Sequence, residues 1–181
     1  MSEKEIKFTV PFDMISLPSK GILYPGCDET IKVEYMTAED ENILTSPNLL
    51  QSGKVLDVLL DRKIKEKGIS SKDLLLGDRN AIMVFLRSTS YGEMYPVKLT
   101  DPTTQKEFET EINLSELKIK NLGATPDENG NFSFDLIRTK KKIKFRLLTT
   151  RDEEDLIKGE ERRAKIYKGD VSNLLTSRLS K

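Results

Sequence analysis

The residue types on which most enzyme active sites depend are scarce in this sequence. The 181-residue chain contains no histidine, and Cys27 is its only cysteine. Ser–His and Cys–His catalysis are therefore excluded, because the base that activates the nucleophile is absent. A zinc site built from cysteine and histidine needs about four such ligands, which one chain does not supply. We therefore expect no enzyme activity, no metal site and no cofactor.

Two charged runs remain as candidates for chemistry. Residues 152–155 are all acidic, but no Asp- and Asn-rich loop with an internal glycine surrounds them, so an EF-hand is excluded. Acids here instead suit the positive end of a helix dipole. Residues 140–146 carry four lysines and one arginine beside Phe145, which suits single-stranded nucleic acid. However, basic residues on a strand edge also protect a protein against edge-to-edge aggregation. The chain as a whole has 30 Lys and Arg against 30 Asp and Glu, so no net charge attracts nucleic acid, and the sequence disfavours a nucleic-acid-binding function.

No segment of the sequence predicts contact with a membrane. The first residues, Met-Ser-Glu-Lys-Glu, are polar and form no apolar signal segment. No apolar run approaches the length that a bilayer requires. We expect a soluble intracellular protein.

An apolar run at residues 81–86 predicts the element around which the fold is organised. Six consecutive apolar residues cover every side of a helix, and such a helix is normally buried on all sides. Asp78 precedes the run and is placed to cap the helix, while Gly92 can end it. We therefore predict a central core helix.

The remaining elements are expected on both sides of this helix. Alternating apolar residues predict strands at 6–10, 31–36, 95–99, 108–112, 132–136 and 143–147. Apolar residues at helical spacing predict helices at 54–67, 70–76 and near the C-terminus, with one more that follows Thr37. The turn at 101–104 predicts a hairpin, and Asn129-Gly130 is a second hairpin signal.

One strand-to-helix element occurs twice. Residues 31–44 align without gaps on residues 143–156, with Thr37 and Thr149 at the same position as helix caps. The match favours a pseudo-symmetric pair of elements. Shared capping rules acting on two unrelated segments are the alternative.

These patterns together predict an α+β fold in which central buried helices are flanked by strands and β-hairpins. We divide the chain into an N-terminal strand and loop region with the first strand-helix element (1–46), a central helical region (47–93), a β-hairpin region (94–148) and C-terminal helices (149–181). The sequence leaves open whether these regions form one compact domain or two small lobes.

Two segments are too apolar for free surface and are candidates for a partner interface. The first is the loop at 17–26, which holds two prolines and two glycines, and the second is the amphipathic C-terminal segment. Each could instead cover the core of its own chain. The residues that we assign to a partner interface are Leu17, Pro18, Tyr24, Leu174, Leu175 and Leu179.

Four stretches in order resemble the baseplate hub subunit family of T-even-like contractile-tailed bacteriophages. They are residues 17–25, 31–46, 76–95 and 145–153. The resemblance implies a non-enzymatic late protein, synthesised in the host cytoplasm and placed in the virion tail baseplate. Relatives often carry cysteine pairs in the hairpin after Tyr91-Gly92, but the turn at 101–104 has none, so a metal-held hairpin is not implied here.

Three functions follow as hypotheses. The first is a structural or assembly subunit of the baseplate hub, which contacts other phage tail and hub proteins and could form a homo-oligomer. The second is a chaperone that leaves before the tail matures. The third is a nucleic-acid-binding module that uses the basic run at 140–146.

Overall fold

A computed structural model describes residues 9–24, 26–27, 29–120, 123–167 and 174–179, with the side chains of Tyr167 and Leu174 left out. Most of the strand expected at 6–10 lies outside these residues. The described N-terminal part contains β1 (Phe12–Ser16), β2 (Thr30–Glu34), α1 (Ala38–Leu44), α2 (Pro47–Ser52), α3 (Val55–Lys63) and α4 (Leu76–Tyr91). The rest contains β3 (Met94–Thr100), β4 (Glu107–Asn113), the 3₁₀ turn η1 (Leu114–Glu116), β5 (Phe132–Asp135), β6 (Lys142–Phe145), α5 (Thr150–Tyr167) and α6 (Leu174–Leu179).

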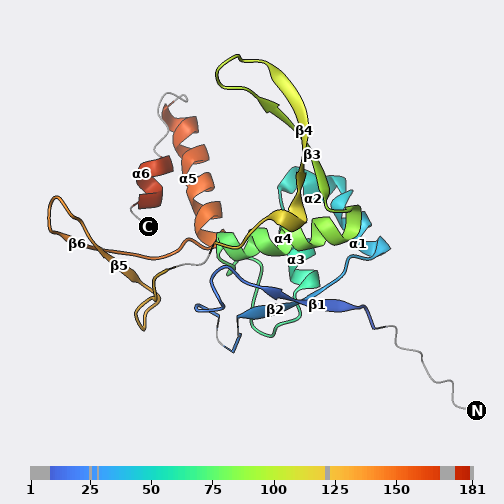
Figure 1. Cartoon of the computed structure of the whole chain (residues 1–181), viewed down its shortest axis with the longest axis horizontal. Helices are drawn as coiled ribbons and strands as arrows, with labels where there is room; N and C mark the ends of the chain where they lie inside the picture. Colours follow the sequence, from blue (N-terminus) through green and yellow to red (C-terminus); the bar gives the residue numbers. More distant parts are fainter. Residues whose placement is uncertain (1–8, 25, 28, 121–122, 168–173, 180–181) are drawn as a thin grey trace, which may run out of the picture.

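The strands of the described chain form three separate antiparallel pairs, β1–β2, β3–β4 and β5–β6. Helix α4 runs through the middle of the molecule, β1–β2 lies along one side of it, and the other two hairpins extend away from it in different directions (Figure 1). The predicted α+β fold, with central helices flanked by hairpins, is confirmed.

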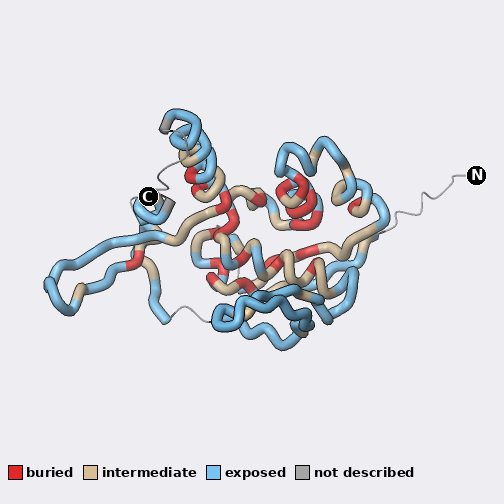
Figure 2. Tube along the Cα trace, turned by 90° about the horizontal axis from the view of Figure 1, so that it is seen from above, coloured by how far each residue is buried: buried red, intermediate tan, exposed pale blue. Residues whose placement is uncertain are grey.

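The hydrophobic core lies where β1–β2, α3 and α4 meet. Ile31 and Val33 of β2 and Ile82 of α4 are completely buried there. Buried residues concentrate around this central region, whereas the two extended hairpins are almost entirely exposed (Figure 2). The core also includes Leu17 and Tyr24 from the loop at 17–26.

Helix α4 is central, but the prediction that it is buried on all sides is wrong. Ile82 and Leu86 are buried, while Met83, Val84 and Phe85 are only half-buried. The core contacts one stripe of the helix, so the apolar residues on its other sides retain exposed surface.

Helix α3 ends earlier than its sequence pattern predicts, because its last apolar residue joins the sheet. Ile64 leaves the helix and forms an antiparallel bridge with Val33, and the Lys65 N–H donates to the Lys32 carbonyl at 3.1 Å. The segment at 70–76, expected as a short helix, instead forms turns that lead into α4, which begins at Leu76.

The hairpin expected at 95–112 is confirmed, whereas Asn129-Gly130 does not connect two paired strands. It lies in a turn before β5, where the Asp127 side chain accepts the N–H groups of Asn129 and Asn131 at 3.0 and 2.9 Å. The connection between β5 and β6 is instead closed by Leu136, whose N–H donates to Lys141 at 2.9 Å.

Candidate protein interface

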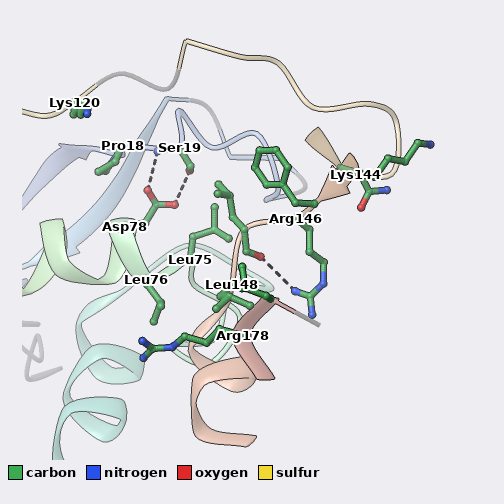
Figure 3. A pocket seen from close by; sticks show the side chains of 15 residues that line it. Pro18, Ser19, Leu75, Leu76, Asp78, Lys120, Lys144, Arg146, Leu148 and Arg178 are labelled. Carbon is green, nitrogen blue, oxygen red and sulfur yellow. Dashed lines mark hydrogen bonds between the residues drawn. The ribbon is translucent and has the colours of Figure 1, made fainter. Parts of the chain in front are cut away.

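A buried carboxylate at the start of α4 fixes the loop at 17–26 in place. Asp78 is completely buried, and its Oδ1 accepts the Ser19 N–H at 2.9 Å. Its Oδ2 accepts the hydroxyl groups of Ser19 at 2.5 Å and Tyr24 at 2.6 Å. Figure 3 shows both Ser19 bonds. Asp78 is therefore not the helix cap that the sequence predicts, because the N-cap position belongs to Leu75.

Tyr24 completes the start of α4 by supplying what Leu75 lacks. The Leu75 N–H donates to the Tyr24 hydroxyl at 2.7 Å, and that hydroxyl donates in turn to Asp78. In a capping box the third helical residue accepts the N-cap N–H directly, so here the phenol relays the same interaction. Burial and the bond to Asp78 raise the pKa of Tyr24 far above its usual range. The phenol therefore stays neutral and keeps its donor.

The two predicted threonine caps are confirmed at α1 and α5. The Thr37 N–H donates to Asp40 at 2.7 Å, and the Thr149 N–H donates to Asp152 at 3.1 Å. Burial alone would raise the pKa of Asp40, but bonds from Lys63 and Thr37 lower it overall. Asp152 occupies the equivalent position in α5 and accepts the N–H of its threonine in the same way.

A paired arginine holds the second of these caps. Arg146 Nη1 and Nη2 lie 2.6 and 2.8 Å from the Asp152 carboxylate oxygens. This pair holds the pKa of Asp152 far below its usual range, despite partial burial. Arg146 is thus engaged within the chain rather than presented to a ligand.

Backbone bonds attach α5, and with it β6, to the central helix. Leu75 and Thr149 form an antiparallel bridge, and the Thr150 N–H donates to the Leu74 carbonyl at 2.9 Å. Lys72 Nζ lies 3.1 Å from Glu154 on α5. The base of the β5–β6 hairpin is therefore anchored firmly while its strands extend outward.

The two copies of the repeat differ in what covers their strands. Ile31 and Val33 of β2 are 0% exposed, whereas their aligned equivalents on β6, Ile143 and Phe145, are 41% and 46% exposed. The strand pattern is the same, but only β2 packs against a core. Among the described residues, the apolar face of β6 is therefore only partly covered, although Phe132 of β5 on the same face is buried.

The β3–β4 hairpin also carries an uncovered apolar face. The register places Tyr95 opposite Ile112 and Leu99 opposite Phe108 on the same face, and all four are exposed. An isolated two-stranded hairpin is marginally stable in water, because it cannot bury such a face by itself. These two hairpin faces are candidate surfaces for contact with a partner.

Two hollows lie next to these hairpins. An apolar groove of 390 Å³ runs between α3 and α4 and is bordered by Leu56, Leu59, Met83, Val84, Tyr95 and Leu114. A cleft of 720 Å³ lies between the loop at 17–26, the start of α4, β6 and α6 (Figure 3). Two of the half-buried residues of α4, Met83 and Val84, border the groove.

Among the described residues, no group of His, Cys, Asp and Glu could hold a metal ion. No helix in the same part of the chain has the length and apolar character to cross a bilayer.

A family comparison agrees with this picture. Residues 9–136 match the family model described as T4 bacteriophage base plate protein. The chain belongs to this family. No curated protein and no solved structure matches it. The matched range contains the loop at 17–26, all of α4 and the β3–β4 hairpin, and it ends before β6. As a baseplate family member, the protein is a structural protein of a phage tail and interacts with other tail proteins.

The predicted interface residues of this baseplate protein lie in different surroundings. Leu17 and Tyr24 are buried in the core of their own chain, with 2% and 6% of their surface exposed. Pro18 and Leu179 border the same 720 Å³ cleft. Leu175 is exposed, and the side chain of Leu174 lies outside the described residues.

Sequence reasoning missed the hairpin faces as candidate interface residues of the baseplate protein. It predicted the alternating strands at 95–99 and 108–112 but did not assign their apolar face to a partner interface. A signal was available in the sequence. The two strands alternate apolar and polar residues, and a two-stranded hairpin cannot bury its apolar face by itself.

Proposed function

We propose that this protein is a structural subunit of the central hub of a contractile-tail baseplate. It would be synthesised in the host cytoplasm, join the assembling tail through protein–protein contacts, and act without catalysis. The observation that carries the proposal is the pair of hairpin faces whose apolar side chains remain largely exposed on a member of the baseplate family. Burial of these faces against neighbouring tail proteins would provide the hydrophobic free energy for incorporation.

The β3–β4 hairpin is the first surface to test, because its two faces differ sharply. Leu99 and Phe108 lie directly opposite each other on the apolar face, while Lys98 and Thr100 lie on the other face of the same hairpin. A variant with Leu99→Ser and Phe108→Ser removes apolar contact area without changing net charge. A control with Lys98→Ser and Thr100→Ser alters two residues of the opposite face.

The experiment is a tagged pull-down from infected cells, read by mass spectrometry beside a protein inventory of purified virions. We expect hub proteins to co-purify with the wild type and the control, and to be lost with the Leu99 and Phe108 variant. The same comparison with Leu175→Asp and Leu179→Asp tests the α6 part of the interface. Recovery of peripheral baseplate proteins instead of hub proteins would contradict the hub assignment.

The virion inventory separates a resident subunit from a departing chaperone. A resident hub subunit is present in mature virions at a fixed ratio to other hub proteins. Absence from virions, with co-purification from infected cells, would replace the structural role by an assembly chaperone role.

A further inference from the structure

The open edges of the two extended hairpins have opposite charge. Strand β4 places Glu107, Glu109 and Glu111 on one face, and strand β6 places Lys142 and Lys144 on one face. We call the three glutamates the acidic edge and the two lysines the basic edge. Both strands belong to two-stranded pairs in the described chain, so each leaves one side of its backbone open for pairing.

We propose that the acidic edge of one copy of this protein pairs with the basic edge of a second copy, which joins the two hairpins into one antiparallel four-stranded sheet. The proposal adds a second copy to the partners of the proposed function and does not depend on the hub assignment.

One antiparallel register satisfies both faces of the joined sheet. It places Glu109 opposite Lys144 and Glu111 opposite Lys142 on the charged face. Residues directly opposite each other in a sheet have Cβ atoms about 5 Å apart, close enough for ion pairs. A shift by one residue would set glutamates opposite apolar side chains. A shift by two residues would use Glu107, which already pairs with Lys98, so the alignment through Glu109 and Glu111 is favoured.

The apolar face of the joined sheet is matched by the same register. Phe108 lies opposite Phe145, and Thr110 lies opposite Ile143. Phe145 already stacks on Phe132 within its own hairpin, with ring centroids 5.6 Å apart. Pairing would therefore extend an existing aromatic cluster across the boundary between copies.

The charges of the two edges are only partly used within the chain. Lys98 lies 2.6 Å from Glu107, and Lys144 lies 3.9 Å from Asp127. Among the described residues, Glu109 and Glu111 have no ion-pair partner. The acidic edge thus retains charge for a partner of opposite sign.

The internal repeat provides an independent argument for an edge partner at β6. Strand β2, the aligned copy, receives an antiparallel partner on its free edge, because Val33 bridges Ile64 and Lys32 accepts the Lys65 N–H. No segment of the described chain occupies the corresponding edge of β6. The second copy would supply at β6 what residues 64–65 supply at β2.

The geometry also explains why β4 rather than β3 would form the contact, and why the partner is another molecule. Strand β3 contains Pro96, which has no N–H to donate, while β4 contains no proline. The two hairpins of one chain extend in different directions from α4 (Figure 1). Each copy would give β4 to one neighbour and β6 to another, an arrangement that closes into a ring or continues as a chain.

A charge-swap experiment with the purified full-length protein tests the proposal. One variant carries Glu109→Lys and Glu111→Lys, and the other carries Lys142→Glu and Lys144→Glu. We expect wild-type self-association, measured by sedimentation velocity, to weaken about tenfold or more in each variant, because two attractive pairs become repulsive. An equimolar mixture of the two variants should restore association.

Cysteine trapping tests the register, because it places Thr110 opposite Ile143. In a Cys27→Ser background, one chain carries Thr110→Cys and the other carries Ile143→Cys. A mixed, oxidised sample should give a crosslinked dimer, since directly opposed strand residues lie within disulfide range. The matched control replaces Thr110→Cys by Thr103→Cys in the hairpin turn and should give no dimer.

Several results would overturn the proposal. These are a wild-type protein that stays monomeric up to its solubility limit, charge-reversed variants that associate like the wild type, and a mixture that fails to restore association. If the charge-reversed variants self-associate like the wild type but lose a different tail protein in the pull-down, the two edges would be assigned to that protein. A failed hub pull-down with intact self-association would refute only the proposed function.

Discussion

Removal of one buried hydroxyl should destabilise the protein far more than removal of an exposed one. Tyr24→Phe deletes the group that accepts the Leu75 N–H at 2.7 Å and donates to Asp78 at 2.6 Å. A hydrogen bond to a charged group contributes about 1.5–3 kcal/mol, and a buried N–H left without an acceptor costs about 1–3 kcal/mol. Together these give a loss of roughly 2.5–6 kcal/mol in the free energy of unfolding, and we expect the lower half of this range because Asp78 keeps both Ser19 bonds.

The assay is urea denaturation followed by far-ultraviolet circular dichroism, with the slope of the transition as a check on two-state behaviour. The matched control is Tyr35→Phe, because the Tyr35 hydroxyl also donates to a carboxylate, Asp13, at 2.6 Å, but at an exposed site. We expect the control to unfold almost like the wild type. Equal losses for the two variants, or a negligible loss for Tyr24→Phe, would refute the relayed cap.

Two further predictions concern the repeat and the turn before β5. Because bonds from Arg146 depress the pKa of Asp152 in the folded state, this carboxylate stabilises the protein above its unfolded pKa of about 3.9, and the contribution is lost as pH falls. Asp152→Asn should therefore flatten the fall of melting temperature from about pH 5 downward, measured by calorimetry, and an unchanged acid limb would contradict this. Gly130→Ala should lower the free energy of unfolding, measured by urea denaturation, clearly more than Gly53→Ala does. Both glycines have a positive φ, +76° and +68°, but a Cβ at Gly130 would lie 2.7 Å from Leu23, whereas the space at Gly53 is open. Equal losses would show that Leu23 moves aside freely.

The elements that sequence reasoning predicted correctly are those whose signals are local. The Thr37 cap, the β3–β4 hairpin and the central helix each depend on residues within a few positions of one another. Alternation, capping and turn chemistry act over that range, so they can be identified without knowledge of the fold. The baseplate family resemblance was confirmed over residues 9–136 as well.

The predictions that failed depend on contacts between distant segments. Ile64 continues the helical pattern of α3, yet the free edge of β2 draws it into a bridge with Val33. Asp78 fits a helix cap by local rules, but Ser19 and Tyr24 use its carboxylate from 59 and 54 positions away. Neither competitor is visible in a short sequence window, so local propensity gave the wrong assignment.

The candidate interface was predictable only in part, because exposure is a property of the assembled fold. The loop at 17–26 reads equally well as a docking segment or a core segment, and the structure buries Leu17 and Tyr24. Conversely, Ile143 and Phe145 have the same alternating pattern as the buried Ile31 and Val33. They are exposed because no core packs against them among the described residues. The four-region division of the chain stays a prediction.

The phenol relay at the start of α4 also constrains the order in which the chain folds. The first turn of a helix is its costly nucleus, and here one of its N–H groups finds its acceptor 51 positions upstream. During synthesis the loop at 17–26 emerges first and has to wait for Asp78 before its own polar groups are satisfied. Docking of the loop and completion of the central helix are therefore one cooperative step. A chain that lacked this loop would lose the ordered beginning of α4 together with its N-terminal hairpin.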